Sequence, residues 1–266
     1  MIKFYQKKEF LNDFVKLIKI CNKVILDIYK QDFEINFKND NSPITVADLK
    51  SNEIIVDYLN ILNKKLTNET KDSFCIISEE SKNMNYVERK NYNYTWLVDP
   101  IDGTKEFLKK NGEFTVNIGL CYLGVPIFGI VSIPVKDEIY YGTEGLGSYK
   151  IDKDNQITEL KIKEKDFNKE NLNIIASKSH LNNETLDYIK QFKNYNLLNV
   201  GSSIKLLYVA EGIADIYPRY APTSEWDTCA SHAVVKYAGG KVINTNNKEE
   251  LIYNKENILN PYFLVY

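Results

Sequence analysis

The stretch that most constrains the fold of this chain is TVNIGLCYLGVPIFGIVSIP, at residues 115–134. Its apolar and β-branched residues divide at Leu123-Gly124, a pair suited to a tight turn, so they predict two long strands joined in a hairpin. A third strand is predicted near EIYYG, at residues 138–142. This part of the chain therefore predicts a largely antiparallel sheet.

Two helices are expected to pack on this sheet. Apolar residues recur at intervals of three and four over residues 10–28, which is the period of an amphipathic helix. A second helix is expected over residues 45–62. Short buried strands are predicted at residues 74–78 and 95–99, each ending on acidic residues. The first half of the chain is thus predicted to be α+β.

Beyond about residue 145, strands and helices alternate, which is typical of a layered α/β arrangement. The strands are predicted at 173–177, 196–200, 214–218 and 241–245, and the helices at 182–192, 202–211 and 227–238. We therefore expect an N-terminal α+β domain over residues 1–145, which carries a metal site. A C-terminal α/β domain over residues 146–266 is expected to carry substrate-binding elements.

The charge balance excludes several classes of partner. Lys and Arg number 34 and Asp and Glu 36, so the net charge of −2 gives no general attraction to nucleic acid or to an anionic membrane.

No apolar run approaches a membrane span, and the charged N-terminus does not fit a signal peptide. The four cysteines are widely separated and are expected to be reduced. We expect a cytoplasmic protein without a transmembrane segment, and leave peripheral membrane association and the choice between monomer and homodimer open.

Acidic residues stand where predicted strands end. Glu79-Glu80 follow the strand at 74–78, Asp99 and Asp102 lie in WLVDPIDGT, and Asp227 lies at a helix start in SEWDT. Strand ends bring side chains from distant parts of a sequence to one cleft. Clustered carboxylates repel one another unless cations neutralise them, and hard oxygen ligands suit Mg²⁺. These clusters therefore predict a two-metal phosphate site.

The segment from Asp99 to Thr104 has the features of a combined metal and phosphate site. Pro100 biases the residue before it away from α-helical backbone, so both aspartates and the Ile101 carbonyl can turn toward one point. Gly103 and Thr104 open a predicted helix, whose N-terminal amides can hold an anion. Metal and phosphate are thus predicted to bind side by side.

Each of these residues also has a purely structural interpretation. Glu79-Glu80 can be a solvated turn, Asp227 a helix N-cap, and Thr45 with Asp48 a capping box. His232 falls among apolar residues at core spacing, so we interpret it as structural. Singly, none of these residues establishes a function.

Four motifs, PITVAD, ISEES, WLVDPIDGTKEF and WDTCASHAVVKYAGG, occur in this order over residues 43–240. Together they resemble the inositol monophosphatase family of Mg²⁺-dependent, lithium-sensitive phosphatases. The resemblance implies the layered αβαβα sugar-phosphatase fold and a cofactor of two or three Mg²⁺ ions. By the same resemblance, the metal ligands are Glu79, Asp99, the Ile101 carbonyl, Asp102 and Asp227.

The resemblance also implies a catalytic set. In the family pattern Asp48 pairs with the Thr104 hydroxyl, and Thr104 with Glu79 orients a water for in-line attack on phosphorus. No residue becomes phosphorylated in this scheme. One departure is visible: the family commonly continues Ala-Ala-Gly after the WDT motif, whereas this chain has Cys229-Ala230-Ser231. The serine adds a hydroxymethyl group where close helix packing is expected.

Lys105-Glu106-Phe107 resembles the bisphosphate nucleotidase branch of the family, the CysQ-type enzymes, as do ASKSH, GSSIK and YPRYAPTSEWDT. Such a substrate needs a second anion site away from the metals. The resemblance suggests Lys205 and Arg219 for this distal phosphate, with Ser202 and His180 near the nucleoside. Arg219 is one of two arginines among 34 basic residues, and its planar fork suits a phosphate. Further substrate contacts are expected from Glu79, Ile101, Asp102, Gly103, Thr104 and Asp227.

These assignments predict removal of the 3'-phosphate of 3'-phosphoadenosine 5'-phosphate (PAP), a small-molecule nucleotide bisphosphate, to give AMP and phosphate. The 5'-phosphosulfate (PAPS) is a further candidate substrate, and the implied role lies in sulfur metabolism. Within the family, inositol monophosphate and fructose 1,6-bisphosphate are alternative substrates. A rival of another class is a catalytically silent sensor that binds metal and nucleotide. Against this rival, Asp48, Glu79 and Thr104 are all present, whereas a silent relative is expected to have lost one of them.

Overall fold

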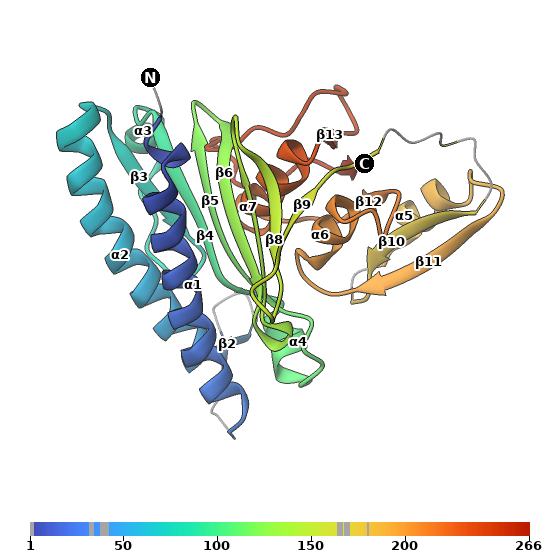
Figure 1. Ribbon diagram of the computed structural model, residues 1–266. Coiled ribbons are helices and arrows are strands. Elements are labelled where there is room, and N and C mark those ends of the chain that lie inside the picture. Colours follow the sequence, from blue (N-terminus) through green and yellow to red (C-terminus); the bar gives the residue numbers. More distant parts are fainter. Residues whose placement is uncertain (1–2, 32–34, 38–42, 164–166, 168–170, 180) are drawn as a thin grey trace.

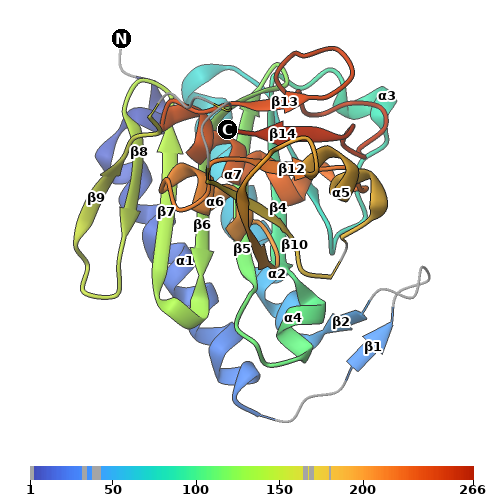
Figure 2. The same ribbon diagram turned by 90° about the vertical axis from the view of Figure 1, so that its right-hand side faces the viewer.

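Helical and strand layers alternate through the molecule in the order αβαβα (Figures 1 and 2). The computed structural model describes residues 3–31, 35–37, 43–163, 167, 171–179 and 181–266. The expected combination of an α+β first half and a layered second half is observed.

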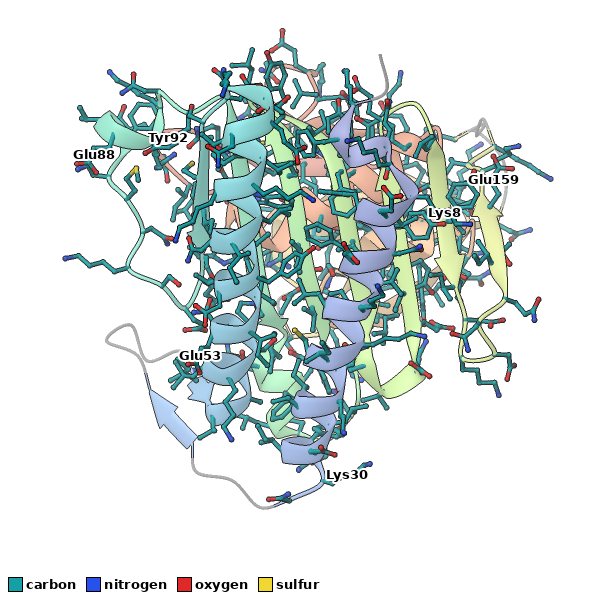
Figure 3. All side chains as sticks on the ribbon, turned by 60° about the vertical axis from the view of Figure 1, so that its left-hand side comes forward. Lys8, Lys30, Glu53, Glu88, Tyr92 and Glu159 are labelled. Carbon is teal, nitrogen blue, oxygen red and sulfur yellow. The ribbon has the colours of Figure 1, made fainter. Side chains whose placement is uncertain are left out.

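The first layer consists of α1 (Lys8–Tyr29) and α2 (Val46–Thr70), with the short η1 (Phe4–Gln6) before them. Figure 3 looks onto these helices, whose outer side carries exposed charges such as Glu53. Helix α2 is longer than the expected 45–62, because Leu66 is buried in the core and Asn63 accepts a hydrogen bond of 2.9 Å from the Trp96 indole. Between the helices, β1 (Ile35–Phe37) and β2 (Pro43–Thr45) form an antiparallel pair.

The second layer is a seven-stranded sheet in which β3 to β9 follow one another in chain order. Its strands are β3 (Phe74–Ser78), β4 (Tyr94–Asp102), β5 (Thr115–Tyr122), β6 (Val125–Ile133), β7 (Glu138–Thr143), β8 (Gly147–Ile151) and β9 (Ile157–Leu160). Only the pairing of β3 with β4 is parallel within this sheet. The predicted hairpin is confirmed: Leu123 and Gly124 both have positive φ, at 48° and 84°. A short η2 (Pro134–Lys136) links β6 to β7.

The sheet continues past residue 145 into β8 and β9, so the domain boundary expected there crosses a hydrogen-bonded sheet. Strand β8 pairs with β7 over five residue pairs, from Ile139↔Ile151 to Thr143↔Gly147. The division into residues 1–145 and 146–266 stays a prediction about folding units. It does not coincide with an edge of the sheet.

The third layer, α6 (Ile204–Ala210) and α7 (Glu225–Tyr237), packs on the face of the sheet opposite α1 and α2 (Figure 1). Glycines on β5 and β6 allow α7 to approach closely. A Cβ atom on Gly129 would lie 2.1 Å from the Ala230 carbonyl oxygen, and one on Gly119 would lie 2.7 Å from the Cys229 sulfur. The sheet therefore fixes the position of α7, and with it the helix start that carries Asp227.

The remaining layers are built from short elements of the second half. Strands β10 (Leu172–Ser177) and β11 (Tyr195–Val200) are parallel, and β12 (Tyr217–Arg219), β14 (Phe263–Val265) and β13 (Val242–Asn244) form an antiparallel group. A bridge between Ile174 and Ile216 connects the two groups. Helix α5 (Asn183–Ile189) packs outside them through Ile189. Two short helices, α3 (Tyr86–Arg89) and α4 (Thr104–Leu108), flank the sheet.

The cysteines have the state expected from the sequence. Cys21, Cys75, Cys121 and Cys229 are free and buried. Desolvation raises the pKa of Cys21 and of Cys121 to about 12. Among the described residues, no helix combines the length and the apolar character that crossing a bilayer requires.

Candidate active site

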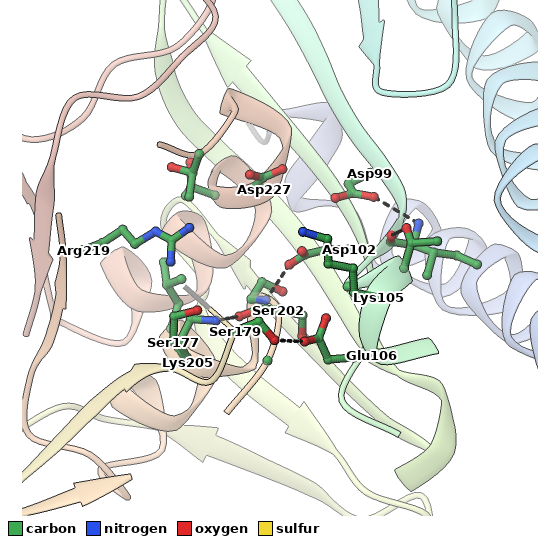
Figure 4. Close-up of a pocket in the computed structure, with 18 of the residues that line it drawn as sticks. Asp99, Asp102, Lys105, Glu106, Ser177, Ser179, Ser202, Lys205, Arg219 and Asp227 are labelled. Atoms are coloured by element: carbon green, nitrogen blue, oxygen red, sulfur yellow. Dashed lines mark hydrogen bonds between the residues drawn. The ribbon is translucent and has the colours of Figure 1, made fainter. Parts of the chain in front are cut away.

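A cavity of about 330 Å³ opens where β3 and β4 end and where α4, α6 and α7 begin. Figure 4 shows Asp99 and Asp102 on one side of it and Arg219 and Lys205 on the other, with Asp227 between them in this view. Most of the residues expected at the metal and substrate sites line this cavity: Glu79, Asp99, Ile101, Asp102, Gly103, Thr104, Ser202, Lys205, Arg219 and Asp227. The predicted convergence of strand ends and helix starts is therefore observed, while the chemical roles of these residues stay predictions.

The backbone of β4 carries two of the aspartates into the cavity. The strand is longer than the expected 95–99 and reaches Asp102, with a shift in its register against β5 between Asp99 and Asp102. Gly103 then turns the chain at a φ of 96° into α4, so the expected helix start is confirmed. A Cβ atom on Gly103 would lie 3.0 Å from the Glu113 carbonyl oxygen, which explains the glycine.

Each aspartate of the cavity is held by one backbone N–H. The pairs are Ile101 N to Asp99 Oδ1 at 3.0 Å, Ser203 N to Asp102 Oδ2 at 2.5 Å, and Ser224 N to Asp227 Oδ2 at 2.8 Å. A carboxylate has two oxygens, so each side chain can keep this bond and offer its other oxygen to a cation.

Burial and mutual repulsion raise the pKa values of these carboxylates. Asp99 is 1% exposed, and desolvation, followed by the charges of Glu79, Asp102 and Asp227, raises its pKa well above the usual value. Desolvation raises the pKa of Asp102 to about 6. It also raises the pKa of Asp227, with Asp102 and Glu79 adding to the effect. This excess of buried negative charge favours the binding of a divalent cation.

The donor set fits Mg²⁺ by its chemistry, since it consists of carboxylate oxygens and the Ile101 carbonyl. Within the part of the chain that the structure describes, no three His, Cys, Asp or Glu side chains already form a closed metal cluster. The carboxylates surround a cavity instead. Such an open arrangement suits Mg²⁺, which usually retains waters and phosphate oxygens among its ligands.

The expected pair of Asp48 and Thr104 is in contact. Thr104 Oγ1 donates to Asp48 Oδ1 at 3.2 Å and lies 3.3 Å from the Ile101 carbonyl oxygen. The other Asp48 oxygen accepts from Thr45 N at 2.8 Å and from Thr45 Oγ1 at 2.5 Å. Asp48 is 1% exposed, and desolvation raises its pKa. The Thr104 hydroxyl is thus fixed between a buried acceptor and the cavity.

The capping box of Thr45 with Asp48 is confirmed, whereas the N-cap of α7 is Ser224 and not Asp227, because the helix begins two residues before Asp227. Asp48 closes a capping box with Thr45 at the start of α2, and Asp227 closes one with Ser224 at the start of α7. Each carboxylate therefore stabilises a helix start near the cavity, and the helix start in turn fixes the carboxylate. For Glu79, which lies directly after β3 and lines the cavity, the backbone N–H donates to the Val98 carbonyl at 3.2 Å.

The loop before α6 contributes Ser202 to the cavity, and the first turn of α6 contributes Lys205. Ser202 has a positive φ of 49°. The Lys205 ammonium donates to the Ser202 carbonyl at 2.5 Å and to the Val200 carbonyl at 3.3 Å, and it lies 5.5 Å from the centre of the Tyr217 ring. Desolvation lowers the pKa of Lys205 to about 8, against the opposing effect of Asp102. Lys205 therefore holds the loop before its helix and also presents a positive charge to the cavity.

Arg219 is 8% exposed at the end of β12. Its Nη2 donates to the Pro222 carbonyl at 3.1 Å. Its Nε is buried and has no hydrogen-bond partner among the described residues. A buried donor without an acceptor is unfavourable, so this side chain is suited to an anionic ligand.

Glu106 and Ser179 also line the cavity, although the sequence did not single them out as site residues. Glu106 is 5% exposed and accepts a hydrogen bond of 2.5 Å from the Ser179 hydroxyl (Figure 4). The Glu106 side chain packs directly against Gly201, where a Cβ atom would lie 2.8 Å from Glu106 Cγ. The sequence carries a signal for this residue, because Glu106 belongs to the Lys105-Glu106-Phe107 segment that indicates the branch of the family.

The structure gives different outcomes for His180, His232 and Ser231. His180 lies outside the described residues. His232 is structural, as predicted: it is fully buried, its Nδ1 lies 2.9 Å from the Tyr253 hydroxyl, and desolvation lowers its pKa to about 3. The unusual Ser231 is accommodated because its hydroxyl donates to the Thr228 carbonyl of its own helix at 3.1 Å.

The chain is similar to known proteins over most of its length. The family model described as "Inositol monophosphatase family" matches residues 6–262. The chain is 36% identical over 257 residues to the 3'(2'),5'-bisphosphate nucleotidase CysQ of Salmonella typhimurium, covering 96% of this chain and 98% of that protein. It is 38% identical over 237 residues to the CysQ of Buchnera aphidicola, covering 88% and 84%.

Solved structures show the same fold. The crystal structure of CysQ from Bacteroides thetaiotaomicron superposes with a TM-score of 0.80 at 41% identity, covering 94% of both chains. An inositol monophosphatase from Thermotoga maritima superposes with a TM-score of 0.73 at 20% identity, covering 96% of this chain and 91% of that one. The second similarity extends to the fold alone.

Proposed function

The chain belongs to the inositol monophosphatase family, and we propose that it is a Mg²⁺-dependent 3'(2'),5'-bisphosphate nucleotidase that converts PAP to AMP and phosphate. PAPS is the further substrate we propose, and the role is the disposal of such nucleotides in the sulfur metabolism of the cytoplasm. The observation that carries the proposal is the presence of carboxylates and of two buried cations, Lys205 and Arg219, around one cavity.

The carboxylates supply the proposed metal site. Glu79, Asp99, the Ile101 carbonyl, Asp102 and Asp227 would hold two or three Mg²⁺ ions. Bound Mg²⁺ supplies Lewis-acid chemistry, which neutralises the charge on the phosphate and on the leaving oxygen. The raised pKa values of Asp99 and Asp227 support this assignment, because a cation relieves the repulsion that raises them.

Thr104 and Glu79 are proposed to orient the attacking water. The Thr104 hydroxyl donates a hydrogen bond to Asp48, so the Thr104 oxygen can accept a hydrogen bond from water. Water held in this way points a lone pair at phosphorus, in line with the leaving 3'-oxygen. Glu79 takes one proton from this water as it attacks and passes it to solvent, the leaving 3'-oxygen takes a proton from solvent, and the chain itself is not modified.

The basic side of the cavity selects the substrate in this proposal. Arg219 offers a buried Nε that no described residue bonds, and Lys205 a second positive charge, to a phosphate that does not react. Ser202 contacts the nucleoside, and His180 is proposed to do so as well. Gly103 leaves room for the reacting phosphate. Inositol monophosphate has a single phosphate and needs no such second anion site, which is why a bisphosphate is favoured.

The experiment measures initial rates of phosphate release from PAP, inositol 1-phosphate and fructose 1,6-bisphosphate. Each is assayed with Mg²⁺, with Mg²⁺ plus Li⁺, and with chelator. The proposal expects the highest kcat/KM for PAP, inhibition by Li⁺ and loss of activity with chelator. A higher kcat/KM for inositol or fructose esters would retain the metal site and reject the substrate. Release from none of them would favour a silent metal and nucleotide sensor. A sizing column would distinguish the proposed alternatives of monomer and homodimer.

A further inference from the structure

Arg89, the other arginine of the chain, is 4% exposed at the end of α3, which lies beside the C-terminal loop, residues 245–262 between β13 and β14 (Figure 2). Its guanidinium donates to three oxygens: Asn254 Oδ1 at 2.6 Å, the Lys255 carbonyl at 2.5 Å and the Glu256 carbonyl at 3.1 Å. In return, the Asn254 side chain donates to the Arg89 carbonyl at 3.2 Å. Arg89 therefore fixes the conformation of residues 254–256.

The segment that Arg89 holds is attached in turn to Glu225, the first residue of α7. The fully buried Glu225 carboxylate accepts hydrogen bonds from Asn254 N at 2.6 Å and from Lys255 N at 3.0 Å. It also accepts one from the Lys255 ammonium. Glu225 N donates to the Ile258 carbonyl at 2.9 Å. The start of α7 is thus tied to the C-terminal loop through both its side chain and its backbone.

A second contact from the same loop holds the other side of this helix start. The Asn260 side chain donates to the Ser224 carbonyl at 2.7 Å and lies 3.0 Å from Thr228 Oγ1. Asn260 N donates to the Thr223 carbonyl at 2.8 Å. Asp227 lies between these two attachment points. The helix start that carries Asp227 is therefore held by the loop that Arg89 fixes as well as by the packing of α7 on the sheet.

Arg89 is also connected to the opposite side of the cavity. It ends the segment that begins with Glu79, directly after β3. Within that segment, Asn83 forms a pair of hydrogen bonds of 2.8 Å with the backbone of Ser78. The chain thus connects the Glu79 segment to Arg89, and hydrogen bonds connect Arg89 through the C-terminal loop to the start of α7.

We propose that Arg89 is a positioning residue, which acts through residues 254–256 and Glu225 to fix the distance between Glu79 and Asp227. This inference rests on the proposed function, since it assigns both carboxylates to a Mg²⁺ site. A lysine could not replace the arginine, because three separate oxygens need the planar fork of a guanidinium. This requirement accounts for an arginine in a chain whose other basic residues, apart from Arg219, are all lysines.

The test compares Arg89→Lys and Glu225→Gln with the unaltered protein. Tyr237→Phe is the control, because it removes a hydrogen bond of 2.8 Å to the Pro126 carbonyl at the opposite end of α7. Metal binding is measured without substrate, by the rise in melting temperature with Mg²⁺ and by the luminescence of Tb³⁺, which the neighbouring Trp226 can sensitise. The Mg²⁺ concentration for half-maximal activity and KM for PAP are measured in parallel.

The proposal expects Arg89→Lys and Glu225→Gln to raise the half-saturating Mg²⁺ concentration about tenfold in the binding and activity measurements. At saturating Mg²⁺, KM for PAP should change less than about twofold. Tyr237→Phe should lower the melting temperature without changing Mg²⁺ binding. Unchanged Mg²⁺ binding in both variants, with only a lower melting temperature, would overturn the positioning role. If the unaltered protein does not respond to Mg²⁺ or Tb³⁺, the proposed metal site fails and the positioning role with it.

Discussion

The Thr104 hydroxyl donates a hydrogen bond of 3.2 Å to the carboxylate of Asp48, although the two residues are 56 positions apart in the chain. Asp48 lies in the first turn of α2 and Thr104 is the first residue of α4, so two helix starts meet at this point. The bond leaves the hydroxyl oxygen as an acceptor toward the cavity. The proposed orientation of the attacking water therefore depends on this hydrogen bond.

Thr104→Val is expected to lower kcat by at least about 100-fold, because the variant keeps the shape of the side chain and loses the group that orients water. Thr104→Ser should retain most of the activity, since its hydroxyl can make the same bond to Asp48. Steady-state rates with saturating Mg²⁺ and PAP measure both. Equal activity of the valine and serine variants would show that the hydroxyl has no role in the reaction.

Asp99→Asn should abolish Mg²⁺-dependent activity, with a loss of more than about 100-fold, and should leave the fold intact. In the absence of metal, its melting temperature should equal or exceed that of the unaltered protein, because the change removes a buried charge repelled by Glu79 and Asp102. Thermal unfolding followed by circular dichroism, beside the activity assay, measures both. Near-normal turnover in this variant would contradict the proposed metal site.

Arg219→Ala should raise KM for PAP about 10- to 100-fold, the usual effect of losing a hydrogen bond to a charged group. Its effect on the turnover of inositol 1-phosphate should be much smaller, because that ester has no second phosphate. Arg219→Lys keeps the charge, so its KM for PAP should lie between that of the unaltered protein and that of Arg219→Ala. Equal losses on both substrates would favour a monophosphate as the substrate.

His232 should make the protein less stable in mild acid. Its pKa is about 3 in the folded chain against an ordinary value of 6.5, so the unfolded chain binds more protons between these values. The free energy of unfolding therefore falls as the pH decreases below about 6.5, by up to about 1.4 kcal/mol per pH unit from this group. Urea unfolding between pH 4 and 7 measures the slope. His232→Asn should show a shallower slope, and an unchanged slope would exclude His232 as its source.

The sequence predicted the central hairpin and the order of elements because strand periodicity and turn residues are local signals. The cavity could be predicted only through the ends of strands, which marked Glu79, Asp99 and Asp102, and through the helix start that marked Asp227. The full length of α2 could not be predicted, since its last turns depend on the packing of Leu66 and on the bond between Asn63 and Trp96. These are contacts with distant residues.

The continuation of the sheet past residue 145 and the attachment of Arg89 escaped prediction for the same reason. Strands β8 and β9 join the first sheet by pairing that no local pattern encodes. Arg89 stood out by composition, but its role depends on Asn254, which is 165 positions further along the chain. A single sequence shows that an arginine is unusual and does not show which residue it binds.

The most direct test of the central claim is to identify the product formed from PAP. PAP is incubated with the protein and Mg²⁺, and the nucleotides are separated by chromatography against AMP and 3'-AMP as standards. The account predicts AMP (the 5'-phosphate) in an amount equal to the phosphate released, and no product when chelator is present. Formation of 3'-AMP, or release of phosphate that chelator does not stop, would contradict it.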